Sequence, residues 1–448
     1  MTQTDRSGTT AEPFQTAPVK AVGWYRWLIC ALLFAATGLL YVDRQTLGFL
    51  KPALSAQYGW DQADYAAIVR CFMVCYAIGF VLFGRLIDTI GAKRGYVIAV
   101  VIWTGAHLAC AVLGFLPPSI MLVSFMVTQG ILGLGQSGNF PAALKAVAEW
   151  FPQRERAFAI GIFNAGSNVG AIVTPLIVPV VMLTFGWQWA FVATGALSLL
   201  WLFFWIPIYG TPSESTRVSK AELAYIESDK YVPVKQMPWL RVLRVRETWA
   251  YALGKFLTDP VWFFYTFWLP PYFLETYRDQ AGNIAGVALP VIVIYVISDV
   301  GSVFGGWMSS AMIKAGLSVN WSRKLSMLIC AFCVLPVAFG TMLFHDMWVS
   351  TFIIGIAAAA HQAFSANLMA LTSDLMPKSA VGSCSGIGGT AGAVGGIVMT
   401  LGVAAALKSL GGYSAVFLVA GLIYFLAVLV IHLLTPKLTP AKLGAETA

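Results

Sequence analysis

Charged residues are scarce in this sequence. Asp, Glu, Lys and Arg make up 11% of the 448 residues, whereas 58% of the residues are hydrophobic. Soluble domains carry about 25% charged residues, and the apolar runs here repeatedly reach the roughly 20 residues that cross a bilayer. The composition therefore excludes a soluble globular protein and predicts a polytopic membrane protein embedded in a lipid bilayer.

The sequence also lacks the usual ingredients of metal sites, disulfide frameworks and catalytic centres. Its four histidines are scattered, its seven cysteines lie in or beside apolar runs, and Cys330-x-x-Cys333 has no second pair. No nucleophile–base set or phosphate-binding loop is recognisable. We therefore expect no enzyme activity and no cofactor.

The net charge of +8 is better explained by basic cytoplasmic loops than by nucleic-acid binding. Residues 1–20 are polar and lack the apolar core of a cleaved signal peptide, so we expect the first span to stay in the mature protein.

Twelve apolar segments are each long enough to span a membrane. They run at 25–46, 64–87, 95–116, 119–143, 157–184, 188–209, 250–274, 287–313, 325–344, 348–372, 382–407 and 413–434. The predicted fold class is all-α integral membrane, with a cytoplasmic tail (1–24), a six-helix bundle (25–210), a cytoplasmic linker (211–248), a second six-helix bundle (249–434) and a second cytoplasmic tail (435–448).

The distribution of basic residues orients the chain. With both termini in the cytoplasm, only Lys51, Arg278 and Lys408 of the 28 Lys and Arg fall outside, and three more lie within spans. The positive-inside rule therefore favours a multi-pass protein of a bacterial-type inner (plasma) membrane with cytoplasmic termini.

The two halves carry matching motifs. Glu149-x-x-Pro152, Gly161 and Gly170 recur as Asp374-x-x-Pro377, Gly386 and Gly395, all shifted by 225 residues. Internal repeats are the usual construction of secondary transporters, and small residues let membrane helices approach closely. The shared offset predicts two related six-helix repeats.

The loop Gly84-Arg85-Leu86-Ile87-Asp88-Thr89-Ile90-Gly91-Ala92-Lys93-Arg94 resembles the signature loop of the major facilitator superfamily. Its glycines suit a tight turn, Asp88 suits a nearby cation or a helix N-terminus, and Arg94 suits the inner face. The resemblance implies the major facilitator fold, with Gly84, Asp88 and Arg94 in gating or structural roles.

Other motifs look like the anion:cation symporter branch of that family. They are Tyr41-Val42-Asp43-Arg44 and Glu149-Trp150-Phe151-Pro152-x-x-Glu155-Arg156. The runs 163–171, 255–262 and 361–368 are similar to its hexuronate transporters. This resemblance implies proton-driven uptake of glucuronate or galacturonate.

The first apolar segment holds two adjacent charges, which are costly inside a bilayer. At about 100° per residue, Arg44 shares a polar or small face with Tyr41, whereas Asp43 points aside between Leu39 and Leu47. A guanidinium binds a carboxylate through two parallel hydrogen bonds. We expect Arg44 to hold the substrate carboxylate and Asp43 to carry the proton; a static, self-neutralising pair is the alternative.

The fourth segment lacks a carboxylate. Gln129 and Gln136 stand on one face where many members of the branch carry an arginine and a glutamate. They could hydrogen-bond sugar hydroxyls in a cavity or simply bridge helices. With glutamines at these positions, either Asp43 alone couples proton movement to transport, or the protein is only weakly coupled to protons, or its sequence has been altered from a parent form.

The remaining intramembrane charges have structural alternatives. Lys255 and Asp259 are four residues apart and could neutralise each other, favouring structure or gating over direct binding. Arg70 lies near the outer end of its segment, where it could snorkel or attract anions. Asp299 is either a conformational ion pair or a second proton-coupling site.

Further polar and aromatic side chains at helical spacing are candidates for a sugar-binding cavity, although each could also bridge or pack helices. They are Asn164, Ser167, Asn168, Tyr265, Trp268, His361, Gln362, Ser365 and Asn367.

The best interpretation is a proton-coupled hexuronate symporter working by alternating access on a small organic anion, without nucleic-acid partners and as a monomer. Rival hypotheses are a symporter of an aldonate, aromatic or dicarboxylic acid, and a non-transporting membrane sensor on the same fold.

Overall fold

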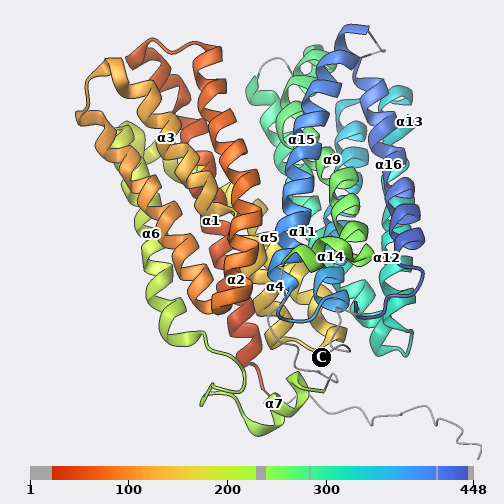
Figure 1. The fold of residues 1–448 in the computed structure, drawn as a ribbon. Helices are drawn as coiled ribbons and strands as arrows, with labels where there is room; N and C mark the ends of the chain where they lie inside the picture. Colours follow the sequence, from red (N-terminus) through yellow and green to blue (C-terminus); the bar gives the residue numbers. More distant parts are fainter. Residues whose placement is uncertain (1–22, 229–238, 282–283, 410–411, 442–448) are drawn as a thin grey trace, which may run out of the picture.

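The computed structural model describes residues 23–228, 239–281, 284–409 and 412–441, and these residues form a bundle of long helices (Figure 1). Most of the predicted N-terminal tail, half of the predicted C-terminal tail and part of the predicted linker lie outside the described residues. The helices are α1 (Tyr25–Tyr58), α2 (Gln62–Val112), the 3₁₀ turn η1 (Leu113–Phe115), α3 (Pro118–Gln136), α4 (Asn139–Trp150), α5 (Gln153–Phe185), α6 (Trp187–Ile208), α7 (Lys220–Ile226), α8 (Trp239–Arg244), α9 (Arg246–Thr276), α10 (Arg278–Ala281), α11 (Ile284–Lys314), α12 (Val319–Val334), α13 (Val337–Leu343), α14 (Met347–Leu375), α15 (Val381–Ser409) and α16 (Tyr413–Leu434).

Ten helical stretches of the described chain are long and apolar enough to cross a membrane. One of them, Ala67–Phe115, contains two predicted spans. They are separated at Gly91, where the backbone of α2 leaves helical geometry (φ 86°, ψ 162°). Only glycine adopts this conformation without strain. The 31-residue α9 covers the predicted seventh span and contains Lys255 and Asp259.

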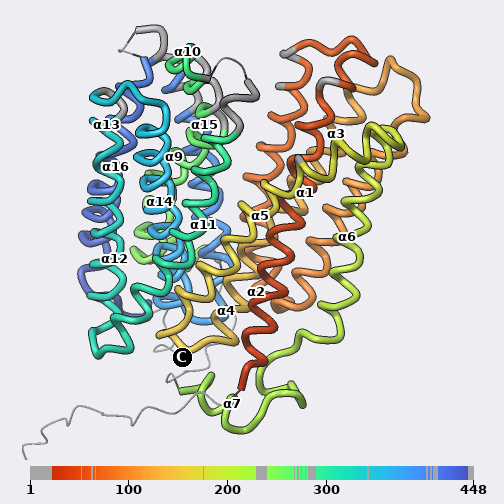
Figure 2. The backbone as a smooth tube through the Cα atoms, turned by 180° about the vertical axis from the view of Figure 1, so that it is seen from behind, coloured from red at the N-terminus to blue at the C-terminus, as the bar shows by residue number. Residues whose placement is uncertain are grey.

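The helices form two groups, α1–α6 and α9–α16, which meet along α2 and α5 on one side and α11 and α15 on the other. Figures 1 and 2 show the groups closest together toward the end where α7 lies and separated at the opposite end. We call these ends the linker side and the far side. The all-helical, two-group architecture confirms the predicted fold class.

The repeated glycines lie where helices touch. A Cβ atom on Gly161 would collide with the Ser302 carbonyl oxygen, and one on Gly386 would collide with that of Phe80. Both contacts join the two groups, α5 to α11 and α15 to α2. The sequence repeat thus corresponds to two equivalent close approaches between backbones.

The second pair of repeated glycines makes equivalent contacts within each group. Gly170 packs on the Gly38 carbonyl, joining α5 to α1, and Gly395 packs on the Phe256 carbonyl, joining α15 to α9. The matched offset therefore reflects the same helix packing in both halves.

Polar contacts seal the linker side between the groups. The Asp88 carboxylate accepts hydrogen bonds from the backbone N–H groups of Gly382 (2.9 Å) and Ser383 (2.6 Å), and the Lys145 ammonium lies 3.5 Å away. A carboxylate at the N-terminus of α15 is favoured by the helix dipole. Asp88 therefore serves both the cation and the helix N-terminus that its motif predicted, whereas the Arg94 side chain is exposed.

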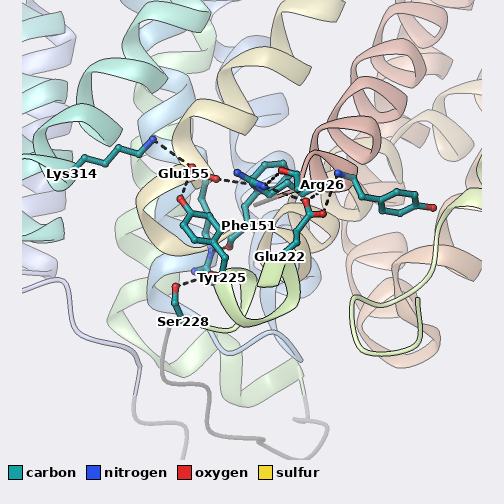
Figure 3. Close-up of polar contacts among 10 residues, drawn as sticks. Arg26, Phe151, Glu155, Glu222, Tyr225, Ser228 and Lys314 are labelled. Atoms are coloured by element: carbon teal, nitrogen blue, oxygen red, sulfur yellow. Dashed lines mark hydrogen bonds and ion pairs between the residues drawn. The ribbon is translucent and has the colours of Figure 1, made fainter. Parts of the chain in front are cut away.

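The linker helix α7 joins this closed side (Figure 3). Glu222 accepts hydrogen bonds from the backbone N–H and the guanidinium of Arg26, both at 3.2 Å, and the Tyr225 hydroxyl donates to Glu155 at 2.7 Å. Glu155 also pairs with Arg26 at 3.0 Å and, in the other group, with Lys314 at 3.5 Å. Burial, together with the bond to Glu155, raises the pKa of Tyr225 to about 12, so its hydroxyl stays a donor at neutral pH.

Candidate functional site

A cavity of about 460 Å³ lies between the two helix groups. It is lined by α1, α2, α3, α4 and α5 from the first group and by α9, α14 and α15 from the second. The predicted site residues that line it are Tyr41, Arg44, Gln129, Asn164, Ser167, Lys255, Asp259, His361, Gln362 and Ser365. Its volume falls within the range of sites for small molecules, about 300–1,000 Å³.

Arg44 is held in place mainly by neutral groups. Its Nε donates to Gln136 Oε1 at 2.9 Å, and its guanidinium carbon lies 5.0, 5.2 and 4.6 Å from the ring centres of Tyr41, Phe72 and Tyr76. Its Nη2 is buried without a hydrogen-bond partner among the described residues. A buried guanidinium held in this way can bind a carboxylate, by donating hydrogen bonds to it, without first breaking an ion pair.

Gln136 bridges the arginine to the backbone of α1. Its amide nitrogen donates to the Leu40 carbonyl at 3.1 Å while its oxygen accepts from Arg44. A glutamate here could accept from Arg44 but could not donate to the carbonyl while ionised. Gln129, in contrast, lines the cavity, and its amide nitrogen contacts Cys110 Sγ at 3.6 Å.

Asp43 does not share the cavity with Arg44. Its carboxyl group is 1% exposed and lies behind α1, where Ser198 Oγ of α6 donates to it at 2.7 Å and His107 Nε2 of α2 lies 3.4 Å away. The angular separation of neighbouring residues in a helix produces this division, as the sequence predicted.

On the opposite wall, Lys255 and Asp259 form the predicted pair one turn apart in α9, with Nζ and Oδ2 separated by 2.7 Å. The His361 ring stacks on Trp262 with centres 5.3 Å apart and an angle of 9°, and His361 Nδ1 lies 2.6 Å from the Tyr424 hydroxyl. The two His361 nitrogens are therefore not equally available to a ligand, because one contacts α16.

The two walls are joined by an amide pair. Asn164 Nδ2 of α5 donates to Gln362 Oε1 of α14 at 3.0 Å and to Ser302 Oγ of α11 at 3.3 Å. Asn164 and Gln362 both line the cavity, so a ligand that competes for these amides acts directly on the contact between the two groups.

The charges on the cavity wall leave an excess of one positive charge. Arg44 and Lys255 contribute two positive charges and Asp259 one negative charge, with His361 counted as neutral. Because Asp259 already pairs with Lys255, the excess lies at Arg44. The arrangement suits a ligand with a single carboxylate.

Several predicted site residues lie elsewhere. Asn168 donates to Asp299 Oδ1 at 2.7 Å and to Ser298 Oγ at 3.3 Å, and Asn367 donates to the carbonyls of Gly305 and Ala363. These asparagines bridge helices rather than line the cavity. Asp299 thus has a neutral partner in α5, not the ion pair considered from the sequence.

Two predicted aromatic site residues of α9, Tyr265 and Trp268, are not among the cavity-lining residues. Tyr265 is 1% exposed in the core and Trp268 packs against that core, whereas Trp262 and Thr266 line the cavity. At about 100° per residue, Tyr265 lies about 60° from Trp262, on the other side from Asp259. Arg70 is exposed and is not among the cavity-lining residues.

Residues that sequence reasoning overlooked complete the wall. Phe72, Tyr76 and Phe80 of α2 line it at successive four-residue spacings, and Tyr251 and Ser385 contribute from the second group. The four-residue spacing of the three aromatics was the available signal, since it places them on one helix face.

Known proteins with similar sequences or similar folds agree with this architecture. Residues 33–400 match the sequence model of the Major Facilitator Superfamily. The hexuronate transporter of Escherichia coli (strain K12) is 29% identical over 429 residues, covering 94% of this chain and 96% of that protein. The galacturonate transporter of Dickeya chrysanthemi is 32% identical over 313 residues, covering 67% and 86%. A crystal structure of the Escherichia coli fucose:proton symporter superposes with a TM-score of 0.68 at 16% identity, covering 92% and 99%.

Proposed function

Since this chain belongs to the major facilitator superfamily, we propose that it is a secondary transporter that takes up hexuronates, such as glucuronate or galacturonate, together with protons by alternating access. The observation that carries the proposal is the guanidinium of Arg44, whose Nη2 is buried in the wall of a central cavity without a hydrogen-bond partner among the described residues. A planar carboxylate matches this group through parallel hydrogen bonds.

The rest of the cavity supports a polar, singly charged sugar. Gln129, Gln362 and Ser365 provide donors and acceptors for hydroxyl groups. One excess positive charge balances one carboxylate, whereas a dicarboxylic acid would leave a second buried carboxylate without a counter-charge. The similarity to a hexuronate transporter and a galacturonate transporter supports this choice.

Two carboxyl groups are the proposed proton carriers. Asp43 lies in the buried polar cluster behind α1, and Asp299 lies between α5 and α11, hydrogen-bonded to Asn168. Each sits where a change of charge would alter helix packing, since a buried charge without a partner is costly. Asp43 is within one residue of Arg44, which links proton binding to the substrate side chain.

In this proposal the linker side faces the cytoplasm. The described linker-side segments carry Arg85, Lys93, Arg94, Arg154 and Arg156, which the positive-inside rule places in the cytoplasm of a bacterial-type inner membrane. The far side then faces the substrate supply, and the closed linker side represents an outward-facing stage of the cycle.

The test is uptake of labelled galacturonate into proteoliposomes with and without an inward proton gradient. We expect accumulation only with the gradient, and competition by glucuronate more strongly than by aldonates, aromatic acids or dicarboxylic acids. Binding without uptake would contradict transport and support a sensor. Uptake that ignores the gradient would contradict proton coupling, and preferred competition by another acid would identify a different cargo.

The substitution Gln136→Glu is expected to make galacturonate affinity depend on pH. An ionised glutamate at this position would neutralise Arg44, so affinity should fall by about tenfold near pH 8 and recover only as the pH approaches the ordinary glutamate pKa of about 4.3, where about half of the carboxyl groups are protonated. Proton-driven accumulation should rise accordingly. Titration calorimetry at the two pH values measures the effect.

Gln129→Glu is the matched control, since Gln129 stands on the same helix and lines the same cavity but contacts Cys110 rather than Arg44. We expect a smaller pH dependence for this variant. Equal pH dependence in both variants would mean that added charge, rather than contact with Arg44, causes the effect.

A further inference from the structure

A buried acid–base pair lies behind α1, outside the cavity. Asp43 of α1 is 1% exposed and His107 of α2 is 0% exposed, with His107 Nε2 3.4 Å from Asp43 Oδ1. His107 Nε2 also lies 2.7 Å from Thr194 Oγ1, while Ser198 Oγ donates to Asp43 Oδ2 at 2.7 Å. Neither titratable group is among the cavity-lining residues, and the substrate site described above leaves His107 without a role.

The cluster is incompletely hydrogen-bonded. Asp43 Oδ1 and His107 Nδ1 are both buried without a hydrogen-bond partner among the described residues. An ionised Asp43 needs a proton on His107 Nε2, because a lone pair on that nitrogen would face the carboxylate oxygen. A protonated Asp43, in contrast, can donate to a neutral His107. The position of one proton therefore decides how the two side chains contact each other.

No other titratable group acts on this pair among the described residues. His107 is the one titratable group of the described chain that interacts electrostatically with Asp43, and Asp43 is the one that interacts with His107. From α6 only the hydroxyls of Thr194 and Ser198 reach the cluster. Arg44, on α1 itself, turns the other way and donates to Gln136.

Asp43 and His107 are connected through α1 to Arg44, the proposed substrate-binding side chain. Gln136 joins the Arg44 guanidinium to the Leu40 carbonyl, one turn before Arg44 in α1. A change in the contact between Asp43 and His107 alters how α1 packs on α2 and α6, and α1 carries Arg44 on its opposite face. Packed helices transmit such changes as discrete shifts.

We propose that His107 is the positioning partner of Asp43: the two side chains share the coupling proton, and His107 sets the pH at which Asp43 takes it up and gives it up. This inference rests on the proposed proton-coupled uptake. It extends that proposal to a residue on α2 that touches neither the substrate cavity nor Arg44.

The transport test compares His107→Gln with the wild type over about pH 5 to 8, the interval in which histidine ordinarily titrates. Glutamine keeps a polar side chain but has no titratable proton. We expect the pH of half-maximal galacturonate uptake to shift by about one unit or more, while galacturonate affinity at a fixed pH changes less than about twofold. His345→Gln, an exposed histidine on the far side, is the control and should leave the pH profile unchanged.

A substrate-free measurement separates the two proposals. The melting temperature of the purified protein is measured across the same pH interval for the wild type, Asp43→Asn, His107→Gln and the double variant. We expect each single variant to remove the same pH-dependent component, and the double variant to remove no more than either.

Each outcome decides one of the proposals. If His107→Gln leaves both the uptake profile and the melting curve unchanged, or lowers uptake equally at every pH, the pair does not act as proposed. If the wild type shows no gradient-driven uptake but the melting curves change together, the pair stands and the proposed transport function fails.

Discussion

Replacing Arg44 by alanine is expected to lower galacturonate affinity by about 100-fold or more. Hydrogen bonds to charged groups contribute about 1.5–3 kcal/mol each, and each 1.4 kcal/mol corresponds to a tenfold change in the dissociation constant. The described cavity lining provides no second unpaired cation for the ligand, since Lys255 binds Asp259 at 2.7 Å. Titration calorimetry or intrinsic tryptophan fluorescence measures the affinity.

Arg44→Lys separates charge from geometry. A lysine keeps the positive charge but presents a single ammonium in place of the planar fork, so we expect a loss of about tenfold rather than 100-fold. Equal losses for both variants would indicate that the flat geometry dominates. No loss for either would contradict the assignment of Arg44 to the carboxylate.

Arg70→Ala is the matched control for both variants. Arg70 belongs to the same helix group, but its side chain is exposed and is not among the cavity-lining residues. We expect its removal to leave affinity unchanged. Melting temperatures check that the Arg44 variants remain folded, because the guanidinium packs on Tyr41, Phe72 and Tyr76.

Local helical geometry accounts for what the sequence predicted well. The different directions of Asp43 and Arg44 follow from about 100° per residue, and the pairing of Lys255 with Asp259 follows from one helical turn. The repeat offset of 225 residues likewise predicted close backbone approaches at the repeated glycines, and these glycines do lie against the backbones of neighbouring helices. These features depend on residues of one helix or on the symmetry of the two halves.

Contacts between helices that are distant in the sequence could not be predicted from helical periodicity. Arg44 meets Gln136, and Asp43 meets His107, only because α1, α2 and α3 pack in a particular register. Asn168 likewise does not line the cavity as predicted, because α5 and α11 approach each other there and Asn168 donates to Asp299 instead. Helix period specifies a face, but it does not specify which other helix covers that face.

The aromatic residues of α9 show a different source of error. Tyr265 and Trp268 were chosen because of their residue type, although the spacing of Lys255, Asp259, Trp262 and Thr266 defines the face that lines the cavity. Side chains three or four residues apart share a helix face. Starting from the paired charges instead of the aromatic residues would have led to Thr266.

Replacing Gly386 by alanine is expected to reduce uptake by about tenfold or more by disfavouring closure of the linker side. The new Cβ would collide with the Phe80 carbonyl oxygen and press on Gly84, both of which are backbone of α2. Overpacking costs about 1–3 kcal/mol, which changes a two-state ratio by about 5- to 150-fold. The collision arises only where α15 meets α2, so a conformation that separates these helices avoids it.

Spin labels at Arg94 and Trp321 measure this shift, because both side chains are exposed near the linker side, one in each helix group. In a cysteine-free background, Gly386→Ala should lengthen the distances between the labels. Gly105→Ala is the matched control, since a Cβ there meets no atom within 4 Å, and it should change neither distances nor uptake. If Gly386→Ala leaves the short distances dominant, the glycine contact does not govern closure. Gly161→Ala, whose new Cβ would collide with the Ser302 carbonyl oxygen, provides a second test. If the equivalent glycine contacts of both repeats hold the linker side closed, this variant should lengthen the distances between the labels as well.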